Sequence, residues 1–255
     1  MNSGEYEVMA ASEESHWWYR GLRDVVVGCL ASPRFQVPAN PRVLDAGCGT
    51  GRNLAALRDA LAPSSLVGFD ASPEALSFAE KKAPEAQLFL GDICAPDLPE
   101  GDLDVVVSLD VIYIPGADRA RPGLQDLVDR LRPGGLLVVN LPAYDWLYSE
   151  HDVAIHTSER YTAPRVGDLL ESIGLAVELM TYRLCFLFPF VVASRLPSLL
   201  RARPGDRSAS SDLHRAPGAF SNETLYAVTK AENNLIQRGL RMPFGSSVFA
   251  IGRKP

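Results

Sequence analysis

Residues 43–51 read VLDAGCGTG, and this segment constrains the fold of the chain more than any other. The apolar run at residues 42–46 predicts a strand. The glycines behind it allow both a sharp turn and a close approach of the backbone to a ligand. A helix that begins at Gly51 would point its free N–H groups at that ligand. The segment therefore predicts a nucleotide-binding strand–turn–helix unit, although a glycine turn of this kind can also be purely structural.

The rest of the chain alternates between apolar runs and segments with helical periodicity, which predicts an α/β fold. The expected strands are residues 42–46, 65–70, 87–90, 103–109, 136–140, 175–182 and 247–252. The expected helices are residues 13–31, 52–61, 73–83, 123–131, 161–173 and 221–239, with Ser12 as the cap of the first. Near-continuous apolar strands such as LDVVVSL are typical of a parallel sheet covered on both faces. We therefore expect a Rossmann-like, seven-stranded, mostly parallel sheet.

The order of these elements divides the chain into three expected parts. Residues 1–41 form an N-terminal helical cap, and residues 42–182 together with 245–255 form the core. Residues 183–244 form a helical insertion between the last two strands, which acts as a substrate lid or an interaction element. Within the insertion, residues 201–218 are rich in Arg, Ser, Pro and Gly, which is typical of a loop.

Carboxylates end or follow several predicted strands, at the edge where open α/β sheets bind ligands. Asp70 ends the second strand, where a carboxylate can accept hydrogen bonds from the two hydroxyls of a ribose. Asp92 follows the third strand, where it could accept the exocyclic amine of an adenine, and Asp110 follows the fourth. Structural alternatives exist: Asp70 can be an acid at a helix N-terminus, and Asp92 a surface turn residue.

The first strand helps to separate two classes of nucleotide-like ligand. Dehydrogenases also combine a glycine turn with an acid at the second strand, but their usual fingerprint is GxGxxG. Here Asp45 lies inside the first strand, two residues before Gly47. A carboxylate at that depth suits a cationic ligand better than a pyrophosphate. S-adenosylmethionine carries an ammonium and a sulfonium group and no phosphate, so the turn favours this cofactor.

Five segments between residues 42 and 142 read VLDAGCGTGRN, VGFDASPEAL, FLGDI, DVVVSLDVI and LRPGGLLVVNLP. In order and spacing they resemble the successive motifs of class I S-adenosylmethionine-dependent methyltransferases. The resemblance implies S-adenosylhomocysteine as a product and a seventh strand inserted antiparallel to the others, in a hairpin with the sixth. The implied cofactor contacts are Asp45, Gly47, Cys48, Gly49, Asn53, Asp70, Ala71, Asp92, Ile93 and Leu109.

The N-terminal region is dense in aromatic side chains, with HWWYR at residues 16–20. It resembles the start of a bacterial small-molecule methyltransferase subfamily, in which a His-Trp-aromatic patch precedes arginines. The resemblance implies that Trp18, Arg20 or Arg23 contacts the carboxylate of the methionine moiety. A structural alternative is that this helix packs on the edge of the sheet through Trp17.

The loop after the fifth strand carries His151, Asp152 and His156, and it leaves the sheet at the ligand-binding edge. Methyl transfer needs mainly alignment, but a hydroxyl acceptor also needs a base, and histidine titrates near neutral pH. We expect His151 to be this base with Asp152 orienting it, and His156 to be the second choice. Alternatively the histidines bind only backbone groups, or the three residues hold a divalent metal. Their spacing fits no common zinc motif, so we expect no resident metal.

Residues 184–192 read LCFLFPFVV and are more apolar than an exposed loop should be. They could form a buried helix, or they could wall a pocket for an apolar acceptor. A third alternative is docking on a membrane surface or on a partner subunit. The arginines that follow could favour anionic headgroups or a phosphorylated acceptor, or could be a solvated face; they are Arg195, Arg201, Arg203 and Arg207.

Composition narrows the partners and the compartment. A net charge of −6 argues against non-specific binding of nucleic acid. The four cysteines form no CxxC pair, and the first 20 residues lack an apolar signal segment. We therefore expect a cytoplasmic protein with reduced thiols, as a monomer or an oligomer.

Together these features predict a methyltransferase that uses S-adenosylmethionine to methylate the oxygen of a small-molecule or lipid-like acceptor, such as a natural product. The fourth motif reads DVIY at residues 110–113 rather than Asn/Asp-Pro-Pro-Tyr, which argues against nucleic-acid and glutamine acceptors. Two rival hypotheses remain. The fold could bind the cofactor and catalyse a non-methylating step such as cyclisation, or it could be a binding module without catalysis.

Overall fold

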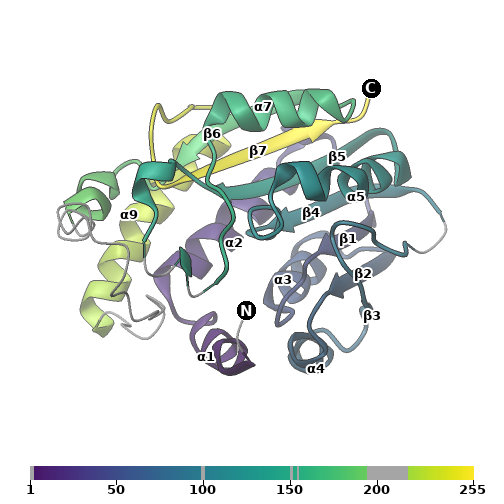
Figure 1. Cartoon of the computed structure of the whole chain (residues 1–255), viewed down its shortest axis with the longest axis horizontal. Coiled ribbons are helices and arrows are strands. Elements are labelled where there is room, and N and C mark those ends of the chain that lie inside the picture. The colour runs from purple at the N-terminus through teal and green to yellow at the C-terminus, as the bar shows by residue number, and fades with distance from the viewer. Residues whose placement is uncertain (1–2, 99–100, 150–151, 154, 194–217) are drawn as a thin grey trace.

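Seven strands of the described part of the chain pair into one mixed sheet at the centre of the molecule (Figure 1). The computed structural model describes residues 3–98, 101–149, 152–153, 155–193 and 218–255. The strands are β1 (Arg42–Ala46), β2 (Ser65–Asp70), β3 (Gln87–Leu90), β4 (Leu103–Leu109), β5 (Leu131–Pro142), β6 (Ala176–Arg183) and β7 (Ser247–Arg253). They lie in the order β3-β2-β1-β4-β5-β7-β6.

The direction of pairing confirms the predicted Rossmann-like α/β fold. Neighbouring strands from β3 to β5 pair in parallel, whereas β7 pairs antiparallel with both β5 and β6. Parallel neighbours need crossover connections, and the helices between the strands supply them. The reversed strand is β7, as the motif resemblance implied.

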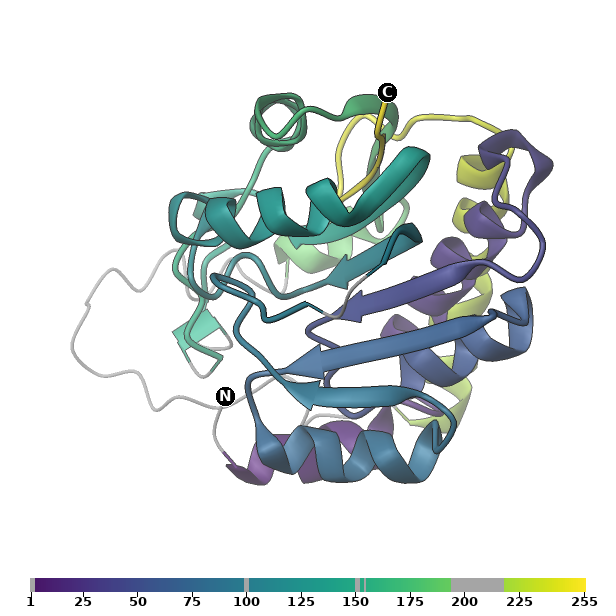
Figure 2. The same ribbon diagram turned by 90° about the vertical axis from the view of Figure 1, so that its right-hand side faces the viewer.

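Helices cover both faces of this sheet (Figure 2). They are α1 (Ser3–Ser12), α2 (Trp17–Leu30), α3 (Arg52–Leu61), α4 (Pro73–Lys82), α5 (Ala117–Arg130), α7 (Ala163–Ser172) and α9 (Ala219–Gln237). One apolar core joins α2, α3 and α9 to one face, and a second core joins α5 and α7 to the other. At the β3 edge, α4 packs beside that strand and α1 packs beside α4.

The central strand β4 shows why the carboxyl edge of the sheet is fixed in position. Val105 and Val107 point into one core and Val106 into the other, and all three have no exposed surface. Burial of each valine side chain contributes roughly 1.5–3 kcal/mol. The residues that follow β4 are therefore held at a rigid edge.

The N-terminal region differs from the single helix predicted at residues 13–31. It forms two helices, α1 and α2, with a turn between them. Ser12 is the last residue of α1, and its hydroxyl donates to the Val8 carbonyl (2.8 Å) instead of capping α2. The cap of α2 is His16, whose Nδ1 accepts from the Trp18 N–H (3.3 Å). Leu22 and Val25 anchor α2 in the core beside the sheet and Trp18 packs against that core, whereas the proposed contact residue Trp17 is not part of it.

Two predicted boundaries around α5 were also wrong. The helix begins at Ala117 rather than at Gly123, and β5 begins at Leu131 rather than at residue 136. Gly123 lies inside the helix. A side chain does not fit at this position, because a Cβ there would come within 1.9 Å of the Ile93 carbonyl oxygen. The glycine serves this close approach and does not mark a helix start.

The apolar segment after β6 leaves the sheet. Strand β6 ends at Arg183, Leu184 has a φ of +61°, and the chain turns into a short helical segment at residues 188–193. Leu184 and Leu187 are buried, whereas Phe190 is 73% exposed. The segment is therefore neither a continuation of β6 nor a fully buried helix. The arginines predicted to act beside it, at positions 195, 201, 203 and 207, lie outside the described residues.

Helix α9 of the insertion packs along α2, which joins the two ends of the chain on one face of the sheet. Asn233 Nδ2 donates to the Gly21 carbonyl (2.7 Å), and a Cβ at Gly21 would lie 2.4 Å from the Thr229 Cγ2. The division of the chain into cap, core and insertion stays a prediction. Within the described ranges, no helix combines the length and hydropathy that crossing a membrane requires.

Candidate functional site

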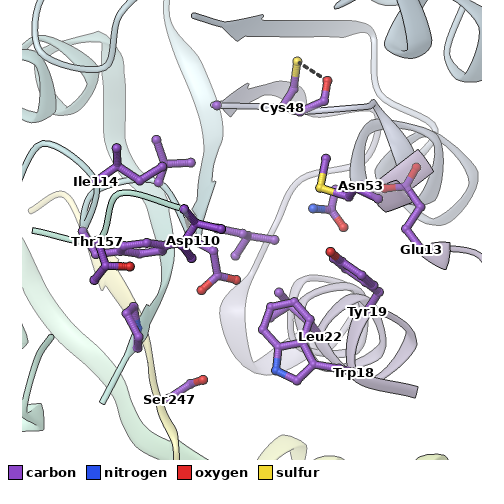
Figure 3. A pocket seen from close by; sticks show the side chains of 18 of the residues that line it. Glu13, Trp18, Tyr19, Leu22, Cys48, Asn53, Asp110, Ile114, Thr157 and Ser247 are labelled. Carbon is purple, nitrogen blue, oxygen red and sulfur yellow. Dashed lines mark hydrogen bonds between the residues drawn. The ribbon is translucent and has the colours of Figure 1, made fainter. Parts of the chain in front are cut away.

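A cavity of about 840 Å³ lies at the carboxyl edge of the sheet. Its walls come from α1, α2, the glycine turn after β1, the ends of β2 to β4 and the loops after β4 and β5. In the close-up, Cys48 and Asn53 lie on one side and Ile114 and Thr157 on the other, with Asp110 between them (Figure 3). Its volume falls in the range of sites for cofactor-sized ligands.

The glycine turn after β1 shapes one wall of this cavity. All three glycines have positive φ: 82° at Gly47, 53° at Gly49 and 84° at Gly51. A Cβ at Gly47 would lie 2.3 Å from the Val111 Cγ2, so this glycine lets the chain after β4 pass close by. A Cβ at Gly49 would meet only the flexible end of Met9, at 3.2 Å. Gly49 is thus required by its backbone conformation, and it leaves the cavity wall bare.

Asp70 ties the end of β2 to the glycine turn. Gly49 N–H donates to its Oδ2 (2.9 Å) and Ser72 N–H donates to its Oδ1 (2.9 Å). Burial raises the pKa of Asp70, and these backbone hydrogen bonds partly offset the effect. Each carboxylate oxygen keeps a further lone pair, so the side chain can still accept hydrogen bonds from a ligand in the cavity.

Asp45 lies behind the cavity wall and does not line the cavity. Its side chain is 1% exposed, and its Oδ2 has no hydrogen-bond partner among the described residues. Burial, and next the charge of Asp70, raise the pKa of Asp45 to about 7. The prediction of direct cofactor contact is therefore not met, although the carboxylate can still act on a cation electrostatically.

Most of the other predicted cofactor residues do line the cavity. Asp92 accepts the Cys94 N–H (2.9 Å), which orients its carboxylate at the end of β3. The predicted contacts brought together in the cavity are Trp18, Gly47, Cys48, Gly49, Asn53, Asp70, Ala71, Asp92, Ile93 and Leu109.

The arginine prediction needs a correction. Arg20 does not line the cavity; it forms an ion pair with Glu223 (2.5 Å) and lies 3.6 Å from the ring centre of Tyr226, both on α9. Arg23, three residues further along α2, is the residue that lines the cavity, together with Arg52. Burial, and next the nearby Arg52, lower the pKa of Arg23. Arg52 pairs with Glu14 (2.7 Å) and Arg23 Nη1 donates to the Glu13 carbonyl (2.7 Å), so the remaining N–H groups of the two guanidinium groups are the ones that can bind an anion at this wall.

The predicted catalytic loop is placed only in part. His151 lies outside the described residues. Asp152 lines the cavity, but its carboxylate is engaged by Arg160 through two hydrogen bonds of 2.9 Å and by Ser149. His156 is exposed and does not line the cavity, because its φ of +60° turns it outward. The structure therefore does not support Asp152 as the residue that orients His151. It does not support His156 as the base either.

His16 is the histidine that lines the cavity within the described ranges. Burial lowers its pKa, which favours the neutral ring. Because Nδ1 accepts the Trp18 N–H, the proton of the neutral ring lies on Nε2. His16 can therefore donate a hydrogen bond to a ligand.

Sequence reasoning missed a group of residues on the far side of the cavity. Asp110 lines the cavity, but sequence reasoning gives this residue no role. The signal that could have identified it is its position directly after a buried strand. Leu184 and Val191 line the cavity too, so the start of the insertion forms part of the wall. The further lining residues without a sequence signal include Tyr6, Met9, Tyr113, Thr157 and Ser247. The described ranges contain no group of three or more His, Cys, Asp or Glu side chains arranged to hold a metal.

Comparison with known proteins agrees with this geometry. Residues 43–135 match the family model of the methyltransferase domain. Trans-aconitate 2-methyltransferase of Variovorax paradoxus is 32% identical over 113 residues, which cover 43% of this chain and 41% of that protein. The match thus spans less than half of the relative's length.

Solved structures show the same fold over nearly the whole chain. A chain of the complex between the Haloferax volcanii Trm112 methyltransferase activator and a methyltransferase superposes with a TM-score of 0.60 at 19% identity, covering 99% of this chain and 94% of that one. The [4+2]-cyclase SpnF superposes with a TM-score of 0.54 at 16% identity, covering 91% and 81%. The chain therefore has the Rossmann-like methyltransferase fold. The resemblance of the aromatic patch to a bacterial subfamily stays a prediction.

Proposed function

We propose that this chain is an S-adenosylmethionine-dependent methyltransferase that methylates an oxygen of a small-molecule or lipid-like acceptor. The observation that carries the proposal is the pair formed by Asp70 and the glycine turn on one wall of the cavity. The N–H groups of Gly49 and Ser72 orient the Asp70 carboxylate, which would accept hydrogen bonds from the two vicinal hydroxyls of a ribose. The match of residues 43–135 to the methyltransferase domain supports it independently.

The residues present fit S-adenosylmethionine from end to end. Asp92, Ile93 and Asp70 all line the cavity, and in this proposal Asp92 and Ile93 bind the adenine and Asp70 binds the ribose. Arg23 and Arg52 would hold the carboxylate of the methionine part. The Asp45 carboxylate behind the turn, whose Oδ2 has no partner among the described residues, would favour the positive charge of the cofactor. When bound, the cofactor supplies an electrophilic methyl group on a sulfonium.

Apolar side chains on the other side of the cavity support a small or lipid-like acceptor. Leu147, Ile155, Leu184 and Val191 line this side, and they come from the loop after β5 and from the start of the insertion. Such walls exclude water and bind an apolar body. A peripheral membrane contact of the insertion stays a prediction.

Calorimetric titration with S-adenosylhomocysteine tests the cofactor half of this proposal. We expect Arg23→Met to lower the affinity at least tenfold, because it removes one of the two cations from the cavity wall. Arg20→Met is the matched control: its guanidinium bonds Glu223 outside the cavity, so its affinity should stay within about twofold of wild type. If the wild-type protein shows no heat of binding, the chain is not an enzyme that uses this cofactor.

Mass spectrometry separates methyl transfer from the rival chemistry. The fold of SpnF shows that a [4+2]-cyclase can share this architecture, so fold alone does not decide the reaction. Methylation of an acceptor converts the cofactor to S-adenosylhomocysteine and adds the mass of one CH₂ to the product. A rearranged product of unchanged mass, formed without S-adenosylhomocysteine, would favour cyclisation instead.

A further inference from the structure

The cavity divides into two halves along the strand order. The residues placed against the cofactor lie at the ends of β3, β2 and β1 and on α2 and α3. The cavity then continues past β1 over β4 and β5, where Asp110, Pro142 and Thr157 line it. The inference concerns this second half, and it rests on the proposed function.

Asp110 occupies the boundary between the halves. Its φ is +58°, a conformation that Asp and Asn adopt more readily than most residues. Its backbone N–H donates to the Asn140 carbonyl (2.9 Å), so the strained turn is fixed against β5. Val111, the next residue, packs over Gly47. The Asp110 side chain therefore projects into the cavity beside the glycine turn (Figure 3).

A relay of side chains from two other strands holds the Asp110 carboxylate. Asn140 Nδ2 on β5 donates to both of its oxygens, at 3.0 and 3.1 Å. Asn140 Oδ1 in turn accepts from Arg183 Nη1 on β6 (3.3 Å). Asn140 and Arg183 have no exposed surface. The carboxylate thus has a fixed direction, and it faces the cavity.

The charges around Asp110 set its proton affinity. Burial raises the pKa of Asp110 to about 7, against the opposing effects of Asn140 and Arg183. Tyr113, in the loop after β4, also interacts with Asp110, and burial raises the pKa of Tyr113 well above its usual value. The positive charge of Arg183 is shared with Glu232 on α9. Near neutral pH, Asp110 can therefore both accept and release a proton.

The two histidines of the described residues, His16 and His156, do not compete for that role. His16 uses Nδ1 as an acceptor for its own helix, and His156 is exposed to solvent. The arginine of this half, Arg160, donates to Asp152 and to the Ala143 carbonyl. Its charge is thus neutralised by a buried partner and is not offered to a ligand.

The remaining cavity arginines belong to the cofactor half. Arg23 and Arg52 lie on α2 and α3, and Arg119 lies near Cys94 at the adenine end. In the described part of the chain, the acceptor half therefore presents a carboxylate without an available cation. A carboxylate acceptor would be repelled there, whereas a neutral hydroxyl could donate its hydrogen bond to Asp110.

We infer that Asp110 is a catalytic residue that takes the proton of a neutral hydroxyl acceptor. As the acceptor O–H bond breaks, its proton moves to an Asp110 carboxylate oxygen. The electron pair on the acceptor oxygen forms the new bond to the methyl carbon, and the carbon–sulfur pair leaves with sulfur, which becomes a neutral thioether. Asp110 then passes the proton to water, so the carboxylate is regenerated.

Calorimetry with two cofactor analogues tests the position of Asp110 without an acceptor. Sinefungin carries an amine, protonated at neutral pH, in place of the methyl-bearing sulfur, and S-adenosylhomocysteine has a neutral thioether there. We expect wild-type protein to bind sinefungin in preference to S-adenosylhomocysteine at pH 8. Asp110→Asn should reduce this preference at least tenfold while changing the affinity for S-adenosylhomocysteine less than threefold. Asn tolerates positive φ, and the retained binding of S-adenosylhomocysteine reports that the variant is folded.

Asp92→Asn is the matched control, because it removes a carboxylate at the adenine end of the same cavity. Both analogues should lose affinity in equal proportion, so that their ratio is unchanged. If wild type binds S-adenosylhomocysteine but Asp110→Asn leaves the ratio unchanged, the inference is wrong and the proposed function stands. If S-adenosylhomocysteine does not bind wild type, the proposed function itself is wrong.

Trans-aconitate tests the acceptor class, because it is the substrate named for the Variovorax relative. We expect no formation of its methyl ester when wild-type protein, S-adenosylmethionine and trans-aconitate are incubated together. The reason is that a tricarboxylate would meet the Asp110 carboxylate without an available cation. Detection of the methyl ester by mass spectrometry would overturn the assignment to neutral hydroxyl acceptors.

Discussion

Replacement of Asp45 by Asn should change how the stability of the ligand-free protein depends on pH. Burial raises the pKa of Asp45 from 3.8 to about 7 in the folded protein, whereas in the unfolded chain this carboxyl is already ionised at pH 6. The folded state therefore binds the extra proton, and the free energy of unfolding falls as the pH rises through 7. The full shift corresponds to a few kcal/mol, of which about 1 kcal/mol falls between pH 6 and pH 8.

Urea unfolding of the ligand-free protein at pH 6 and pH 8 measures this difference. Between the two pH values, the free energy of unfolding of Asp45→Asn should fall by about 1 kcal/mol less than that of wild type, because the amide does not ionise. Asp126→Asn is the control, since Asp126 is exposed on α5 and its replacement should leave the wild-type dependence intact. An Asp45→Asn variant with the same pH dependence as wild type would refute the argument that this carboxyl ionises in a buried site.

Two further predictions concern the scaffold of the site. Asp152→Asn should lower the free energy of unfolding by about 3–5 kcal/mol, because it leaves the buried Arg160 guanidinium without its charged partner. Urea denaturation measures this loss, and a loss below about 1 kcal/mol would contradict the prediction. Gly51→Ala should destabilise more than Gly134→Ala, although their φ values are 84° and 83°. An alanine at either position would carry roughly 1–2 kcal/mol of strain from the left-handed backbone conformation. Of these two positions, only Gly51 would also bring the new Cβ against backbone, 2.6 Å from the Ala79 Cα. Equal losses in thermal unfolding would show that the contact does not matter.

The fold could be predicted because its signals are local. A strand buried on both faces must be apolar along its length, and β4 and β5 show this in their own sequence. Caps and glycine turns also act within a few residues, as at Ser72, whose hydroxyl accepts the Ala75 N–H at the start of α4. The errors arose where a distant contact overrides the local signal. Gly123 resembles a helix boundary in sequence, but it serves a contact with the Ile93 carbonyl from another loop.

The two halves of the site also differ in whether their residues can be predicted from local sequence signals. The cofactor half could be predicted because each contact follows its own strand, so the order of elements places Asp70 and Asp92 on one edge. The acceptor half is assembled across elements distant in sequence, and no spacing shows that Arg183 lies behind Asp110. Side-chain direction is a further limit: Arg20 and Arg23 are three residues apart on α2, yet only Arg23 lines the cavity.

Some energetically costly features of this protein lie in or directly behind the cavity where its chemistry is proposed. Asp45 Oδ2 and the Thr157 hydroxyl are buried without a hydrogen-bond partner among the described residues. Two buried nitrogens of Arg183, Nε and Nη2, also lack a hydrogen-bond partner there. Asp110 and Leu184 both line the cavity with φ near +60°. Each such feature costs stability in the ligand-free state. Such features in and behind the cavity are expected if ligands supply some of the missing partners, because groups arranged for a reaction cannot also satisfy one another beforehand.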